Sequence, residues 1–108
     1  MRARKTRTKI MSAMTAKQVS IHLKTVPNWS KRAQTIRRTF TFEGFLESID
    51  FVNRVAKEAQ KSNHHPDIDI RFNKVTLKLT THDEGGLTEK DFSLARQCDE
   101  VFSKYVVP

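Results

Sequence analysis

Three of the four histidines of this 108-residue chain are of a type and spacing that could support proton transfer. His64 and His65 are adjacent and precede Pro66, and His82 follows later in the same half of the chain. Imidazole has an intrinsic pKa of about 6.5, so it can donate or accept a proton near neutral pH. Acid–base catalysis therefore stands beside two other interpretations, a metal site and ordinary turn or strand-end positions. A metal site is the least favoured, because adjacent histidines in an extended segment point in opposite directions and no cysteine or carboxylate lies at a recognised ligand spacing.

A β-hairpin is predicted to bring these histidines together. Residues 67–72 and residues 75–82 each alternate between apolar and polar side chains, which is typical of strands. The pair Asn73–Lys74 can form the turn between them. In such a hairpin the end of the second strand, at His82, lies beside the start of the first, where His64 enters.

The segment before the hairpin predicts a helix, a short extended stretch and a strand. Thr15 opens a capping-box sequence, so a helix should begin there and end before Pro27. Trp29 lies in the extended stretch that follows. Residues 34–42 then alternate like a strand with one exception, because Arg38 falls on the apolar face.

Two further helices flank the hairpin. One runs from Phe45 to about residues 63–64, because Pro66 disfavours helical geometry at the residue before it. The other begins after Thr88, a good N-cap, and Asp91 can return the hydrogen bond of a capping box. The longer helix carries an apolar stripe at spacings of three and four, made of Phe45, Ile49, Val52, Ala56 and Ala59.

The order of these elements, α-β-β-α-β-β-α, predicts an α+β fold. Short connections favour a four-stranded antiparallel sheet with three helices on one face. We expect residues 15–108 to form this single domain and residues 1–14 to form a basic, flexible N-terminal extension.

The formal net charge of +8 is distributed unevenly. Residues 1–42 hold 11 of the 20 basic residues and no acid, whereas the remainder holds 9 basic and all 12 acidic residues. Because the imbalance is local and no aromatic residue lies among the first charges, a nucleic-acid partner is not favoured. No apolar run is long enough to span a membrane. The lone Cys98 fits a reducing compartment, so we expect the cytoplasm, with organellar targeting by the basic N-terminus left open.

The histidines also belong to a longer pattern. His64-His65-Pro66 is followed by the aromatic Phe72, by His82 ten residues later, and by Asp91. This pattern resembles the pterin-4a-carbinolamine dehydratases (4a-hydroxytetrahydrobiopterin dehydratases), and the resemblance covers roughly residues 15–103.

The resemblance implies a lyase that needs no cofactor and no metal. Members of the family remove water from 4a-hydroxytetrahydropterin, the product of aromatic amino acid hydroxylases, and release quinonoid dihydropterin. The N5 lone pair expels the C4a hydroxyl when a general acid protonates the leaving oxygen, and a base accepts the N5 proton. The resemblance thus implies tetrahydrobiopterin recycling and a functional link to a hydroxylase.

The family pattern also implies roles for individual residues. His64 and His82 would be the catalytic acid–base partners, and His65 would bind and orient the pterin ring. Asn63 and Thr81 flank the histidines and are expected to offer polar contacts. Asp91 belongs to the pattern, although helix capping is a sufficient explanation for it. The implied substrate-binding set is therefore His65, Asn63, Thr81, Gln60 and Asp91.

Three further positions need separate predictions, and one of them departs from the family pattern. Gln60 stands where the family places a charged residue four before the first histidine. Residues i and i+4 share a helix face, so an acid at this position would orient His64, and we expect Gln60 to weaken turnover. Trp29 and Phe72 are predicted to be core aromatics rather than platforms that stack on the pterin.

An interaction module of the same fold is the alternative function. Some family members also act as dimerisation cofactors of a homeodomain transcription factor. The family commonly assembles as a tetramer made of dimers, so a homodimer or homotetramer is expected.

Overall fold

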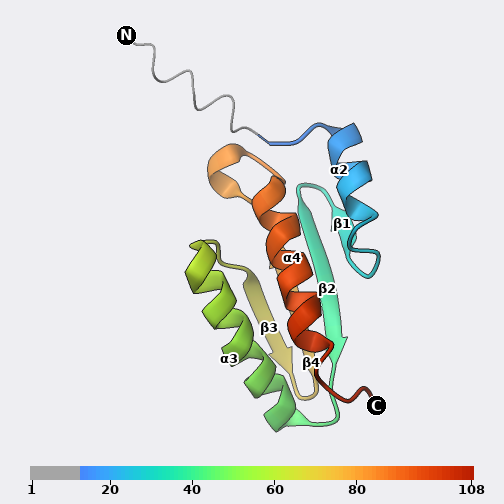
Figure 1. The fold of residues 1–108 in the computed structure, drawn as a ribbon, viewed down its shortest axis with the longest axis vertical. Coiled ribbons are helices and arrows are strands. Elements are labelled where there is room, and N and C mark those ends of the chain that lie inside the picture. The colour runs from blue at the N-terminus through green and yellow to red at the C-terminus, as the bar shows by residue number, and fades with distance from the viewer. Residues whose placement is uncertain (1–12) are drawn as a thin grey trace.

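Three helices pack on one face of a four-stranded antiparallel sheet in the computed structural model, which describes residues 13–108 (Figure 1). The strand order is β1-β2-β4-β3, and each neighbouring pair is antiparallel. This arrangement confirms the predicted α+β fold and the order of its elements. The elements are α2 (Ala16–Leu23), β1 (Ser30–Arg32), β2 (Thr35–Thr41), α3 (Phe45–Ser62), β3 (Asp67–Arg71), β4 (Lys74–Leu79), the 3-10 turn η1 (His82–Glu84) and α4 (Glu89–Phe102).

Capping boxes start the first and last helices, as the sequence predicts. At α2 the backbone N–H of Gln18 donates to the Thr15 hydroxyl, and the Thr15 N–H donates to the Gln18 side chain. At α4 the Thr88 hydroxyl accepts from the backbone N–H of Lys90, and the Asp91 carboxylate accepts from the Thr88 N–H. Each box satisfies N–H groups that a helix leaves without partners in its first turn.

Arg38, the exception in the β2 alternation, is accommodated by α4. Its guanidinium donates to Asp99 at 2.7 Å and lies over the rings of Phe40 and Phe102. Trp29 is buried, as predicted, and its indole N–H donates to the same Asp99 oxygen at 2.8 Å. A charged residue on the core face is therefore paired and stacked rather than left unsatisfied.

The buried stripe of α3 is not the predicted one. The helix buries Ser48, Phe51, Val55 and Ala59, so only the last of these belongs to the predicted stripe. Phe45 is 49% exposed and Ala56 is also exposed. The helix is rotated because Phe51 packs against Phe40 of β2 and against Phe42 just after that strand, with ring centroids 4.8 Å and 5.0 Å apart.

Both strands of the predicted hairpin are shorter than expected. β3 ends at Arg71, and Phe72 adopts a left-handed backbone conformation with φ of 52°. Its side chain is 68% exposed, so the prediction of a core aromatic at this position is wrong. The side-chain amide of the next residue, Asn73, donates to the carbonyl of Phe42, which directly follows β2, and so holds the turn in place. β4 ends at Leu79, so His82 lies in η1 rather than in a strand.

Candidate active site

The C-terminus of α3 sets the directions of two histidines. The helix ends at Ser62 because Asn63 adopts the left-handed conformation, which is a common way to cap a helix. The chain then turns so that the His64 side chain is only 11% exposed, whereas His65 is exposed. Gln60 consequently contacts His65, with 3.0 Å between Oε1 and Nε2. The premise that position 60 shares a helix face with His64 is therefore wrong, because α3 ends at Ser62 and His64 lies beyond it.

The loop after β4 presents the third histidine. Thr81 and Gly86 form an isolated antiparallel bridge with two backbone hydrogen bonds, and η1 lies between them. Gly85 closes this turn with φ of 79°, a conformation that favours glycine. His82 begins the turn and is exposed to solvent.

A buried carboxylate from α4 binds the first histidine. Asp91 is fully buried, and its Oδ1 lies 2.6 Å from His64 Nε2. Its other oxygen accepts from the Thr81 hydroxyl at 2.8 Å and from the Thr88 backbone N–H at 3.0 Å. Three donors therefore satisfy a carboxylate that would otherwise be costly to bury. Asp91 caps the helix, as predicted, and also fixes the ring of His64.

These elements line a solvent-open pocket of about 240 Å³. All three histidines contribute to it, which agrees with the proximity expected from the hairpin, and Asn63 and Thr81 contribute as well. The remaining residues of the predicted set lie outside its lining: Gln60 contacts His65 and Asp91 contacts His64. The pocket is lined by Asn63, His64, His65, Thr80, Thr81, His82, Asp83 and Lys90.

Sequence reasoning did not select three of these lining residues. Thr80 and Asp83 come from the chain that leaves β4, where the predicted strand was continued too far. Lys90 comes from the first turn of α4, one residue before Asp91. Its place beside a pattern residue at the start of a helix was the signal that could have identified it.

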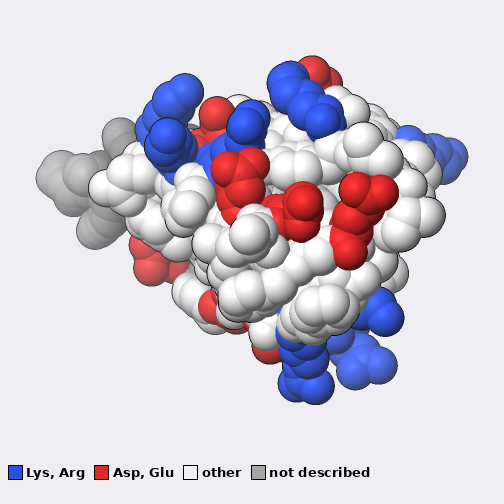
Figure 2. Space-filling view, turned by 90° about the horizontal axis from the view of Figure 1, so that it is seen from below, with Lys and Arg blue, Asp and Glu red and all other residues white. Residues whose placement is uncertain are grey.

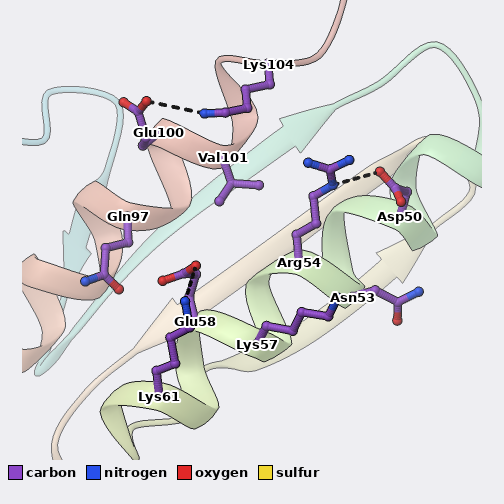
Figure 3. Close-up of a pocket in the computed structure, with 10 residues that line it drawn as sticks. All are labelled: Asp50, Asn53, Arg54, Lys57, Glu58, Lys61, Gln97, Glu100, Val101 and Lys104. Atoms are coloured by element: carbon purple, nitrogen blue, oxygen red, sulfur yellow. Dashed lines mark hydrogen bonds and ion pairs between the residues drawn. The ribbon is translucent and has the colours of Figure 1, made fainter.

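A larger groove of about 680 Å³ lies between α3 and α4 (Figure 3). Its charged side chains pair with one another, as in Arg54–Asp50, Lys61–Glu58 and Lys104–Glu100. No histidine lines it. Because imidazole can donate or accept a proton near neutral pH and three histidines line the smaller pocket, that pocket is the candidate active site.

The charge of the described residues does not form a surface of one sign on the face in view. Five basic residues lie in the N-terminal segment outside the described residues, which leaves 15 basic and 12 acidic residues and a net charge of +3. Figure 2 shows these side chains interspersed on one end of the molecule.

Within residues 13–108, no helix is long and apolar enough to cross a membrane. The same residues contain no cluster of three or more histidine, cysteine or carboxylate side chains that could hold a metal ion.

Comparison with known proteins gives consistent results. Residues 12–101 match the family model described as Pterin 4 alpha carbinolamine dehydratase. A curated relative from Picosynechococcus sp. is 49% identical over 82% of this chain and 96% of its own length, and one from Mycobacteroides abscessus is 45% identical over 82% and 95%. Both bear the name pterin-4-alpha-carbinolamine dehydratase provisionally. The crystal structure of a transcriptional coactivator/pterin dehydratase from Brucella melitensis is similar, with a TM-score of 0.80 and 30% identity over 83% of this chain and 98% of that one.

Proposed function

Because the chain belongs to the pterin 4 alpha carbinolamine dehydratase family, we propose that it removes water from 4a-hydroxytetrahydrobiopterin by histidine acid–base catalysis. The observation that carries the proposal is one pocket lined by three imidazoles, of which His64 is held by the buried carboxylate of Asp91. Such an arrangement places proton donors and acceptors around one pocket, with His64 held in a fixed orientation, and an elimination of water requires such groups.

The reaction moves two protons and changes no oxidation state overall. A general acid protonates the C4a hydroxyl, the C4a–O bond breaks, and the N5 lone pair forms the C4a=N5 double bond. A general base takes the N5 proton, so the products are water and quinonoid dihydrobiopterin. One histidine as acid and one as base are therefore enough for the step.

His64 and His82 are the proposed acid–base pair. They enter the pocket from different elements, the end of α3 and the start of η1, so they can approach different parts of a bound pterin. His65, steadied by Gln60, is proposed to bind and orient the ring, and Asn63 to offer a polar contact. The substrate is the product that an aromatic amino acid hydroxylase leaves, so the proposed role is pterin recycling.

The test is the rate of dehydration in an assay coupled to an aromatic amino acid hydroxylase. The wild-type protein should accelerate the step, and His64→Ala and His82→Ala should each lower kcat by about 10²–10⁴-fold, the usual contribution of an acid–base group. His22→Ala is the matched control, because His22 pairs with Glu89 on α4 and does not line the pocket. Full activity in both pocket variants would refute the proposal.

We also propose that the protein forms a homodimer or homotetramer. β3 is an edge strand, and α3 runs along the same side of the sheet (Figure 1). Large apolar side chains are exposed on or next to these two elements, namely Phe45, Leu46, Ile68 and Phe72. A monomer rarely exposes so many on one side, and an open strand edge can pair with another copy.

Light scattering after gel filtration tests the assembly. Phe72→Asn should reduce the mass of the particle, because it removes an exposed aromatic while asparagine tolerates the left-handed backbone. A wild-type monomer would contradict the proposal. An assembled protein that never accelerates dehydration would instead support the alternative, a non-catalytic interaction module.

A further inference from the structure

The Asp91–His64 contact is one end of a longer chain of hydrogen bonds. The Thr81 hydroxyl lies 2.8 Å from Asp91 Oδ2 and 2.9 Å from the Thr88 hydroxyl. The Thr88 hydroxyl in turn lies 3.2 Å from the backbone nitrogen of Lys90. Thr81 is 95% buried, and these contacts connect the first turn of α4 to the pocket.

The direction of every bond in this chain follows from its two ends. A carboxylate can only accept, so the single Thr81 proton must point to Asp91, and the Thr81 oxygen must accept from Thr88. The Thr88 proton is then used, so its oxygen accepts from the Lys90 N–H. The same carboxylate requires a hydrogen on His64 Nε2, which leaves Nδ1 as the ring nitrogen that can exchange a proton.

We infer that Thr81 and Thr88 are positioning residues: they hold Asp91 in the orientation in which its Oδ1 meets His64 Nε2, and Asp91 in turn selects the nitrogen with which His64 transfers protons. The inference rests on the proposed function for its role in catalysis, but the tautomer of His64 is a property of the free protein. The Thr81 hydroxyl is thereby assigned to Asp91 and not to the substrate. Because Thr88 is also the N-cap of α4, the same residue starts the helix and helps to orient the imidazole of His64.

The experiment compares Thr81→Val, which is nearly isosteric but lacks the hydroxyl, with Thr81→Ser, which keeps it. We expect kcat of Thr81→Val to fall about tenfold with KM within about twofold, and Thr81→Ser to keep the wild-type kcat. Long-range ¹H–¹⁵N spectra of the free protein should show neutral His64 protonated at Nε2 in wild type and Thr81→Ser. In Thr81→Val, Asp91 is no longer held against His64 by the hydroxyl, so the spectra should show a mixture of tautomers. Thr88→Ala, at the half-buried far end of the chain, should show the same mixture to a smaller extent and serves if Thr81→Val fails to fold.

Two results would overturn the inference. One is a wild-type spectrum in which neutral His64 is protonated at Nδ1 or already occurs as a mixture of the two tautomers. The other is a valine or alanine variant, folded, whose His64 spectrum and kcat match wild type. If the wild-type protein lacks dehydratase activity while the spectra behave as expected, the proposed function fails and the positioning of His64 stands.

Discussion

Asp91→Asn is the substitution that separates the orientation of His64 from the stability of the fold. The Thr81 hydroxyl and the Thr88 N–H both donate to Asp91 Oδ2, so an asparagine must turn its carbonyl oxygen toward them. Its NH₂ group then occupies the position 2.6 Å from His64 Nε2. That nitrogen must become an acceptor, which moves the His64 proton to Nδ1.

The expected loss of activity is much larger than the expected loss of stability. Reversing the tautomer places a hydrogen on the nitrogen proposed to exchange protons, so kcat should fall by about 10²–10⁴-fold. Asparagine keeps the capping acceptor and replaces charge-assisted hydrogen bonds by neutral ones, a loss of about 1 kcal/mol in the free energy of unfolding. For a domain of this size that corresponds to a decrease in Tm of roughly 4–8 °C.

Asp99→Asn provides the matched control. Asp99 lies on the same helix and also accepts two side-chain hydrogen bonds, from Arg38 and Trp29, but it does not line the pocket. The Asp99→Asn variant should lose about as much free energy of unfolding as Asp91→Asn and should keep the wild-type kcat. Two measurements are needed for each variant: kcat in the hydroxylase-coupled dehydration assay, and Tm from thermal unfolding followed by circular dichroism. If folded Asp91→Asn keeps kcat within about threefold of wild type, Asp91 does not act through His64 and the reasoning is refuted.

Three other predictions concern groups that the structure describes. Gln60→Glu places a carboxylate against His65, which favours the protonated imidazole, so the dehydration rate and its pH dependence should both change. An unchanged pH–rate profile would show that this contact does not affect catalysis. Burial and the hydrogen bond to Asp50 raise the pKa of Tyr105 to about 12, so the free energy of unfolding should fall as pH rises from about 10 to about 12, and Tyr105→Phe should flatten this decrease in denaturant titrations. Burial raises the pKa of Cys98 to about 12, so labelling by a thiol reagent at pH 8 should be as slow as global unfolding, and rapid labelling of the native protein would contradict its burial.

Features encoded by neighbouring residues were predictable from the sequence. The capping boxes at Thr15 and Thr88 depend on contacts three residues apart, and the structure shows both. The alternation of residues 75–82 likewise predicted a strand with one apolar face, and Val75 and Leu77 on that face are buried in β4. The fold class followed because these local signals fix the element order, and short connections leave few topologies.

Features that depend on distant contacts were not predictable in the same way. The rotation of α3 is set by Phe51 packing on β2, so its apolar stripe did not indicate the buried face. The exposure of Phe72 follows from a left-handed turn residue, which the alternation did not reveal. The contact between His64 and Asp91 joins residues 27 positions apart, and a capping role was already a sufficient explanation for the carboxylate.

The first described residues have a practical consequence for how this protein is produced. The backbone of Ala13 donates to Glu84 and that of Met14 donates to Leu87, so they fasten the loop that follows His82. Gly86 permits this approach, since a Cβ there would lie 3.1 Å from the Ala13 side chain and 2.6 Å from Gln34 Oε1. A version of the protein that starts at Thr15 would lose these two hydrogen bonds. An affinity tag fused directly before Thr15 would put foreign residues in the place of Ala13 and Met14. Cloning boundaries should therefore leave Ala13 and Met14 in place, with any tag at the C-terminus, where the chain ends in exposed residues.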